Sequence, residues 1–503
     1  MRACLKPLAL TLLVSGCIAT PVLAATNQSL EATVAKLQKD VAVLKKSHAD
    51  EASSSTATDP NTNTKNGKNK NRTVVQASSG TAFNLREYLP FDPDVPGEAY
   101  VSSGPYIGTN IAFSGSNLIV NSPSVNTDLQ LLNIRKSILT QLSALLREGN
   151  LKPEHSHLLL SGVIESQANY TNHGGAPSTT DIDVTNVSID TTIFGPSDWI
   201  LGFIELSYDN GTPQQSVFQS TSNYRTANAH VYVNKAFVTI GDLTKSPFYT
   251  TFGQFYVPFG TYSSVMVSDT LTKLITRTKA RSIEVGMMQQ SDNAFYGSAY
   301  IFRGDSHAAS VSKVNNGGIN VGYKFDAGFF KGNVGGGIIA NIADSGGMQF
   351  GTGFQDNEQI VHRVPGYNAR ATLSLGEHID LIGEWVSGST RFNPNDMSFN
   401  NHGATPSAID LEASYSFPIF EKPSSIGIGY GKSNQALAMG IPLTRTSLVF
   451  NTSLLRHTLQ SIEFRHDRQY ASSDIATGAG NTTVISQNGK SDNAVTAQFD
   501  YYF

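Results

Sequence analysis

Cysteine is almost absent from this 503-residue chain, and its two cysteines, Cys4 and Cys17, stand near the start. Removal of the leader described below would leave no thiol, which excludes disulfides, thiolate metal sites and cysteine nucleophiles from the mature protein. Long apolar runs are missing too. No stretch of eighteen or more apolar residues follows the leader, so helical membrane spans are excluded. The formal net charge of −4 excludes a generally basic nucleic-acid binder.

Catalytic signatures are also lacking. The sequence contains no G-x-S-x-G, no H-E-x-x-H and no phosphate-cradling glycine loop. His155 and His157 would share one strand face, and Asp181 and Asp183 stand close together. Two ligands make an incomplete metal site, however, and polar wall or surface positions account for both pairs. We therefore predict that the protein is not an enzyme and holds neither a cofactor nor a metal ion.

What the sequence does contain is a long region of alternating apolar and polar residues, from residue 153 to residue 503. In Ile409–Phe417 and in Tyr367–Leu375, one face is apolar and the other is polar. This period of two is typical of β-strands with one wet face. An apolar content of only 39% fits a wall whose other face meets water. A water-soluble sandwich would also alternate, so alternation alone does not decide between the two.

About sixteen such segments can be counted, and an even number is what single-chain bacterial barrels require. The predicted fold is all-β: an antiparallel transmembrane β-barrel of about sixteen strands that encloses an aqueous lumen. The predicted strands lie near residues 155–169, 181–194, 198–209, 228–241, 248–257, 280–289, 295–303, 318–326, 328–341, 367–376, 378–387, 408–418, 424–432, 443–452, 456–467 and 493–503.

The last strand ends on a specific pattern, in which Phe499, Tyr501 and Phe503 occupy alternate positions up to the final residue. This arrangement resembles the terminal-strand signal that the outer-membrane assembly machinery reads. Together with a signal peptide over residues 1–24, it predicts a bacterial outer-membrane protein that contacts the lipid bilayer and that machinery. Its N-terminal segment would lie in the periplasm. A competing interpretation of the leader is a lipobox, which would leave a lipidated Cys17 as the mature N-terminus.

Three further segments precede the barrel. Residues 25–46 space their apolar residues alternately by four and three, which predicts a short coiled-coil helix. Such a helix is stable only on association, so a homo-oligomer and a frayed monomeric helix both fit the pattern. Residues 47–80 form a polar, disordered linker. Residues 81–152 combine a Pro- and Gly-rich block with an apolar helix over 129–147, which we expect to plug the barrel or to cover its periplasmic mouth.

Basic residues are concentrated, with no acid among them, in the segment Thr272–Arg281. The segment follows a strand after a gap that is too long for a turn. A loop that folds into the pore would make it a cationic constriction, which favours small anions. Alternatively, these cations balance luminal acids, among them Glu384, Asp410, Glu412 and Glu463. The predicted constriction residues are Lys273, Arg277, Lys279, Arg281 and Arg370.

Three motifs carry a family resemblance: Tyr88-Leu89-Pro90-Phe91, Gly104-Pro105-Tyr106-Ile107-Gly108-Thr109 and the segment from Gly253 to Gly260. With the order of the segments, they resemble the LbtU-type siderophore porins over the length of the mature chain. The last motif is also similar to phosphate-selective porins.

The resemblance implies uptake of a ferric, carboxylate-type siderophore without a TonB-type plug, and it fixes no ligand residue. Two alternatives stay open: a general or anion-selective diffusion porin, and an envelope tether or adhesin that the barrel anchors.

Overall fold

The computed structural model describes residues 99–103, 126–135, 156–209, 230–352, 354 and 359–503, with gaps at 196, 198, 309–312, 456 and 480–482. The predicted signal peptide, coiled coil and linker lie outside the described residues, as does the second half of the predicted helix. Among the described residues, no helix is long and apolar enough to cross a membrane.

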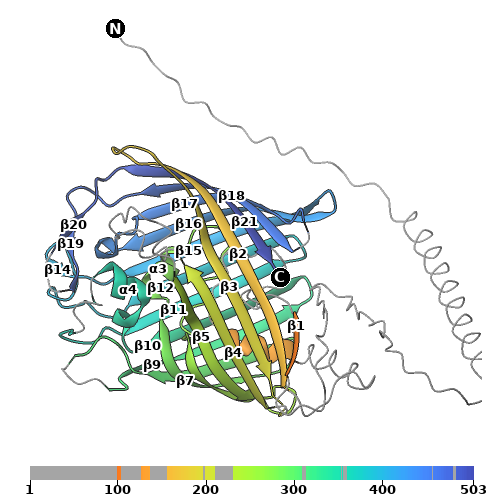
Figure 1. Ribbon diagram of the computed structural model, residues 1–503. Coiled ribbons are helices and arrows are strands. Elements are labelled where there is room, and N and C mark those ends of the chain that lie inside the picture. The colour runs from red at the N-terminus through yellow and green to blue at the C-terminus, as the bar shows by residue number, and fades with distance from the viewer. Residues whose placement is uncertain are drawn as a thin grey trace, which may run out of the picture. The chain divides into compact units, whose positions relative to one another are not determined.

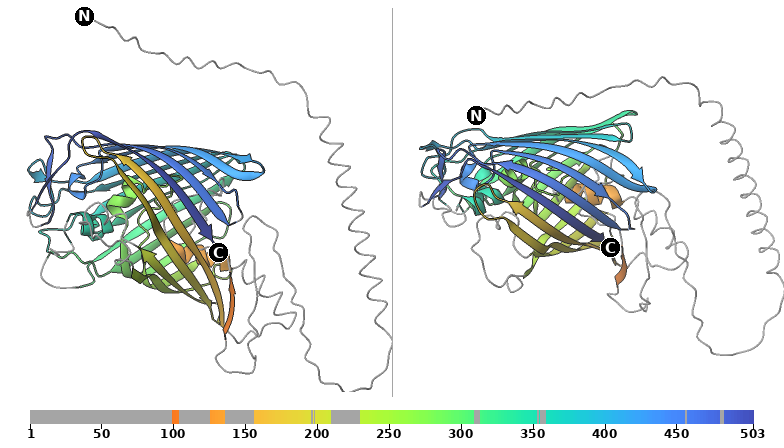
Figure 2. Two further views of the ribbon diagram at one scale, coloured as in Figure 1. Left: turned by 45° about the horizontal axis from the view of Figure 1, so that its top comes forward. Right: turned by 90° about the horizontal axis from the view of Figure 1, so that it is seen from above.

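Sixteen antiparallel strands form one closed barrel, and its closure is the pairing of the first of them with the last (Figure 1). Figure 2 shows these two strands, β2 in yellow and β21 in dark blue, side by side along the seam. The predicted barrel is confirmed, with strand bounds within a few residues of those expected. The strands are β2 (Ser156–Asn172), β3 (Thr179–Phe194), β4 (Ile200–Asp209), β5 (His230–Gly241), β6 (Phe248–Tyr256), β7 (Lys279–Met288), β8 (Ala294–Phe302), β9 (Asn316–Ala327), β10 (Phe330–Ile339), β11 (Gly366–Leu375), β12 (Ile379–Gly388), β15 (Ser407–Ile419), β16 (Lys422–Asn434), β17 (Thr444–Thr452), β18 (Thr458–Arg468) and β21 (Ser491–Tyr502).

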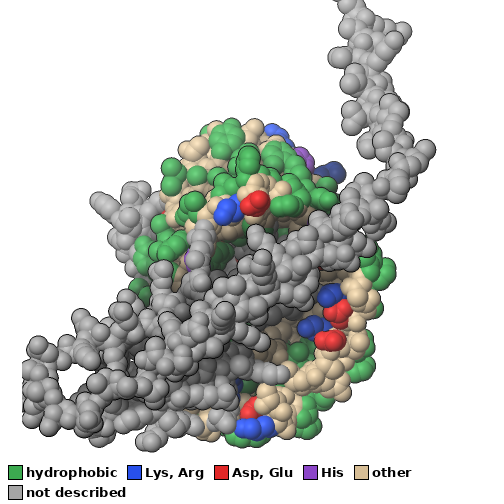
Figure 3. Space-filling view, turned by 90° about the vertical axis from the view of Figure 1, so that its right-hand side faces the viewer, with side chains coloured by type: hydrophobic (Ala, Val, Ile, Leu, Met, Phe, Trp, Pro, Cys, Tyr) green, Lys and Arg blue, Asp and Glu red, His purple; other side chains and the backbone are tan. Residues whose placement is uncertain are grey.

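The outer face of the wall is apolar. On β16, Ile426, Ile428 and Tyr430 are 45%, 57% and 45% exposed, while the residues between them are buried on the inner side. Hydrophobic side chains lie around the outer rim of the described barrel in Figure 3. Exposed apolar side chains in such a continuous band would be costly in water, whereas lipid tails cover them at no cost. The barrel is therefore membrane-embedded.

Aromatic side chains gather on the outer face near the end where β2 begins and β21 finishes, which we call the short-turn end. The rings of Tyr415 and Phe417 stack at 5.9 Å, and those of Tyr501 and Phe503 at 6.2 Å. Such a girdle marks the level of the lipid headgroups. Phe499, Tyr501 and Phe503 all belong to this outer face, since each is more than 40% exposed. Their role as an assembly signal stays a prediction.

Tyrosine rings lie flat on the inner wall where the neighbouring strand offers a glycine. A Cβ atom on Gly286 would stand 2.3 Å from Cζ of Tyr249, and one on Gly322 would stand 2.2 Å from Cζ of Tyr296. Real Cβ atoms do not approach other atoms so closely, so only glycine fits at these positions. The flat rings line the wall instead of crossing the lumen.

One strand that joins the wall was not predicted. β1 (Ala99–Ser103) pairs in parallel with the first five residues of β2, Ser156–Leu160. Those residues lie beyond the last residue of β21, because Phe503 already pairs with Gly162. β1 thus covers a strand edge that the seam leaves open, and an uncovered edge is a template for pairing with other chains.

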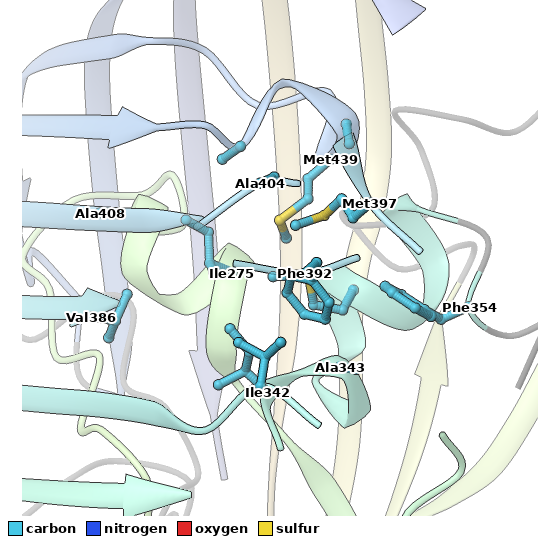
Figure 4. Packing of buried hydrophobic residues seen from close by; sticks show 14 of the residues in the cluster. Ile275, Ile342, Ala343, Phe354, Val386, Phe392, Met397, Ala404, Ala408 and Met439 are labelled. Atoms are coloured by element: carbon cyan, nitrogen blue, oxygen red, sulfur yellow. The ribbon is translucent and has the colours of Figure 1, made fainter. Parts of the chain in front are cut away.

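The opposite end, which we call the long-loop end, carries a packed cap. Its loops form a second sheet of four short strands, β13 (Ser398–Phe399), β14 (His402–Gly403), β19 (Ile475–Thr477) and β20 (Val484–Ser486). Figure 4 shows the apolar core beneath it, where Phe354, Phe392, Met397 and Met439 lie with Ile275. The loops at this end are therefore folded onto one another.

The contact of Gly162 with the terminal residue gives a prediction about the seam. A Cβ atom on Gly162 would stand 2.5 Å from both Cζ of Phe503 and the Ser188 carbonyl oxygen. We expect Gly162→Ala to lower the free energy of unfolding by about 1–3 kcal/mol, the usual cost of overpacking. Urea unfolding, followed by the heat-modifiable gel mobility of the barrel, measures the change. Gly202→Ala is the control, because its nearest contact is an ordinary 3.4 Å. Equal effects of both variants would contradict the account.

Candidate functional site

The segment 257–278, between β6 and β7, does not continue the wall but lies inside the barrel, and we call it the constriction loop. It includes the short helix α3 (Leu271–Thr276), which Figure 1 places within the ring of strands. Its hydrogen-bond partners stand on β12, β15, β17 and β18, far along the wall from the strands that the loop connects. The loop therefore spans the lumen and narrows it.

Buried carboxylates on the wall hold the backbone of this loop. Glu384 on β12 accepts hydrogen bonds from the amides of Thr261 and Tyr262, at 2.9 and 2.8 Å. Glu412 on β15 accepts from the amide of Val265 at 2.9 Å. Hydrogen bonds to a charged acceptor are roughly twice as strong as neutral ones, and inside the barrel wall little water competes for them.

The same arrangement continues along the loop. Glu463 on β18 accepts from the amides of Val267 and Ser268, at 2.6 and 2.9 Å, and Asp410 on β15 accepts from the amide of Thr272 at 2.8 Å. Glu384, Glu412 and Glu463 thus receive amides spaced three residues apart, those of Tyr262, Val265 and Ser268. Within the part of the chain that the structure describes, none of the four carboxylates has a Lys or Arg nitrogen within 4 Å. Their main partner is the loop backbone.

Of the predicted constriction residues, Lys273 lies on α3, and its Nζ is 2.6 Å from Asp269. Burial lowers the pKa of Lys273, and the nearby Asp269 carboxylate opposes that shift. Arg277 directly follows α3, with its Cζ 4.7 Å from the ring centroid of Tyr256. Both residues therefore belong to the loop that lies inside the barrel.

The other three predicted residues stand on strands. Lys279 begins β7 and donates a hydrogen bond to Asn234 on β5. Arg281 pairs with Gln254, where β6 is still joined to β5, so its strand parity, which is that of the exposed Ile283 and Val285, directs it to the outer face of the wall. Arg370 on β11 is buried, and its guanidinium donates to Asn320 and Asn368, at 2.6 and 3.0 Å, and to Tyr296 at 3.3 Å. The constriction assignment of all five stays a prediction.

A second obstruction lies in the lumen toward the short-turn end. Residues 127–135 are helical, and they form the described half of the helix predicted over 129–147. Asp128 accepts a hydrogen bond from Thr251 on the inner wall at 2.7 Å, and Thr127 accepts one from Lys235 at 3.2 Å. This helix is drawn in orange inside the barrel in Figure 2.

The far side of the described helix contacts the short turns. Arg135 donates to the carbonyl oxygens of Gly241 and Ser197, at 3.0 and 3.3 Å. Leu132 is buried against Leu243 and Tyr249. These contacts place the described half inside the mouth of the short-turn end. Whether the whole helix acts as a plug stays a prediction.

No family model matches the chain. A UPF0422 protein from Coxiella burnetii is 38% identical to it over 407 residues, which cover 80% of this chain and 84% of that protein. The chain belongs to the UPF0422 family. A second UPF0422 protein, from Legionella pneumophila strain Philadelphia 1, is 36% identical over 430 residues, which cover 80% of this chain and 76% of that one. The resemblance to LbtU-type siderophore porins stays a prediction.

Solved structures similar to this UPF0422 protein are outer-membrane porins. An anion-selective porin from Comamonas acidovorans has a TM-score of 0.45 and 11% identity, covering 69% of this chain and 100% of that one. The outer-membrane channel DcaP of Acinetobacter baumannii has a TM-score of 0.45 and 12% identity, covering 69% and 97%. A likeness this distant says nothing about which solute the UPF0422 chain passes.

The carboxylate anchors give a prediction about the loop. We expect Glu412→Ala to leave the Val265 amide without an acceptor, at a cost of about 1–3 kcal/mol. The loosened loop should raise the single-channel conductance in planar bilayers and make the current noisier. Asp500→Asn is the control, since Asp500 is a buried inner-wall carboxylate that contacts Gln498 and Tyr502 instead of the loop. A conductance equal to that of wild type in Glu412→Ala would rule out the anchoring role.

The helix gives a second prediction. Leu132 is only 4% exposed, so Leu132→Asp places a charge against apolar neighbours and should release the helix from the wall. Trypsin should then cleave after Arg135, which is also 4% exposed in the folded protein. The readout is the fragment pattern of the folded barrel after brief digestion. Leu454→Asp, at a residue that is 46% exposed, should leave Arg135 protected. Cleavage at Arg135 in wild type would contradict the packing.

Proposed function

We propose that this outer-membrane porin is a ligand-selective pore that takes up a ferric, carboxylate-type siderophore. The carrying observation is the pairing of four wall carboxylates with the backbone of the constriction loop. Because those acids bind backbone amides, they do not form ion pairs with the cations elsewhere in the lumen. These cations therefore still attract an anionic solute. A ferric complex of a polycarboxylate carries the negative charge that these cations attract.

The distribution of ion pairs supports this proposal. Lys235 is paired with Glu205 at 2.6 Å, and Arg445 with Asp467 at 2.8 Å, so these cations are neutralised locally. Arg277, Lys279 and Arg370 have no carboxylate oxygen within 4 Å among the described residues. A charge that is not paired within the protein attracts a passing anion more strongly.

The two obstructions favour selective uptake over general diffusion. A loop held at several points and a helix seated in the short-turn mouth leave less room than an open barrel of sixteen strands. An anion-selective diffusion porin is the second candidate, because the same three cations would also serve small inorganic anions. The tether hypothesis concerns residues 25–80, which lie outside the described residues.

Uptake of iron as a labelled ferric polycarboxylate siderophore, at limiting concentration, tests the proposal. Cells that lack the gene should lose a saturable component of uptake, and the full-length gene should restore it. Unchanged iron uptake together with reduced permeation of chloride and phosphate would replace the proposal with the diffusion porin.

Arg370 provides a variant for the same assay. We expect Arg370→Gln to lower the rate of siderophore uptake about tenfold, which corresponds to roughly 1.4 kcal/mol of lost attraction. The asparagine and tyrosine acceptors around residue 370 can also receive hydrogen bonds from a glutamine amide. Lys331→Gln is the control, because Lys331 pairs with Asp326 at an exposed site near the short-turn end. Equal rates of siderophore uptake in the two variants would show that Arg370 does not contact the siderophore during uptake.

A further inference from the structure

The tip of the β6–β7 hairpin leaves the barrel wall. Pairing of β5 with β6 stops at Ala236 and Gln254, whereas pairing of β6 with β7 continues to Tyr256 and Lys279. The chain beyond this tip is the constriction loop, which lies in the lumen. The side chains of Tyr256 and Lys279 consequently meet the inner surface of β5, where each contacts Asn234.

A β-bulge in β5 aims Asn234 at this position. The register between β4 and β5 shifts at Glu205, so Asn234 is an extra residue beside Lys235, and a bulge of this kind turns its side chain. Asn234 donates from Nδ2 to Glu205 at 2.5 Å. Glu205 is also paired with the buried Lys235 at 2.6 Å. Ser207 donates to it as well, at 3.2 Å, so this carboxylate is engaged by three partners and is not available to Lys279.

The amide oxygen of Asn234 then organises the hairpin tip. It accepts a hydrogen bond from Nζ of Lys279 at 3.2 Å and from the hydroxyl of Tyr256 at 3.4 Å. Nζ of Lys279 also stands 5.3 Å from the ring centroid of Tyr232 and 5.8 Å from that of Tyr256. An ammonium near two rings is held in place by cation–π attraction.

Arg277 completes the cluster. Its guanidinium stands over the ring of Tyr256, with Cζ 4.7 Å from the ring centroid. No described residue accepts a hydrogen bond from its five N–H groups, and Lys279 uses one of its three N–H groups on Asn234. Arg277 is half-buried and Lys279 is exposed. Two cations are thus held beside aromatic rings, and most of their N–H donors have no acceptor among the described residues.

We propose that Arg277, Lys279, Tyr232, Tyr256 and Asn234 form a binding site for a small organic polycarboxylate at the root of the constriction loop. The planar fork of Arg277 matches one carboxylate in a bidentate manner, and Lys279 receives a second. The tyrosine rings contact the carbon skeleton between them, which inorganic anions lack. The inference deepens the proposed function, because it gives the ferric polycarboxylate a first docking point in the lumen.

The test uses the full-length protein in planar bilayers at constant ionic strength, with citrate as the probe. Citrate should reduce the open-channel current in a saturable way, and Arg277→Gln with Lys279→Gln should raise the half-blocking concentration at least tenfold. Lys432→Gln is the control, since Lys432 shares the outer face of β16 with Ile428 and Tyr430. Heat-modifiable gel mobility confirms that each variant is folded.

Three outcomes decide the matter. Equal block by citrate in the double variant and in wild type overturns the site. Block by phosphate at the same concentration as citrate overturns its selectivity for carboxylates. Loss of citrate block in the double variant, together with no role of the protein in siderophore uptake, supports the site and overturns the proposed function instead.

Discussion

The hydrogen bonds between wall carboxylates and the backbone of the constriction loop are the constraint on which the interior depends. Glu384, Glu412 and Glu463 each accept hydrogen bonds from loop amides, which include those of residues 262, 265 and 268, three residues apart. A loop crossing a lumen has many amides that no strand can satisfy, and unsatisfied amides are costly. The carboxylates accept hydrogen bonds from these amides and thereby fix the position of α3. Ile275 on α3 then packs in the apolar core of the cap.

Fixing the loop also decides which charges stay available. Once the four acids are engaged with amides, Arg277 and Lys279 have tyrosine rings and Asn234 as their neighbours. Lys273, four residues before Arg277, is paired with Asp269 instead. Neighbouring cations of one basic segment therefore have different chemical environments, and the difference comes from what surrounds each side chain.

The strands could be predicted because their signal is local. Each is a run of alternating residues that needs no information about its partner, and the sixteen expected segments match the observed ones. β1 was missed because its parallel partner, Ser156–Leu160, stands more than fifty positions away and the pairing leaves no local pattern. The cap strands are too short, at two or three residues, to show a period.

The sequence by itself determined the barrel, its membrane face and the presence of a basic segment that is too long for a turn. From the sequence, Glu384, Asp410, Glu412 and Glu463 were expected only to balance the positive charge of that segment. The tertiary structure decided that these acids bind loop amides and that Arg281 has the parity of lipid-facing Ile283. The physical reason for this difference is that the alternation of a strand depends only on residues that are neighbours in the chain. The partner of a luminal charge depends on where a distant loop comes to lie.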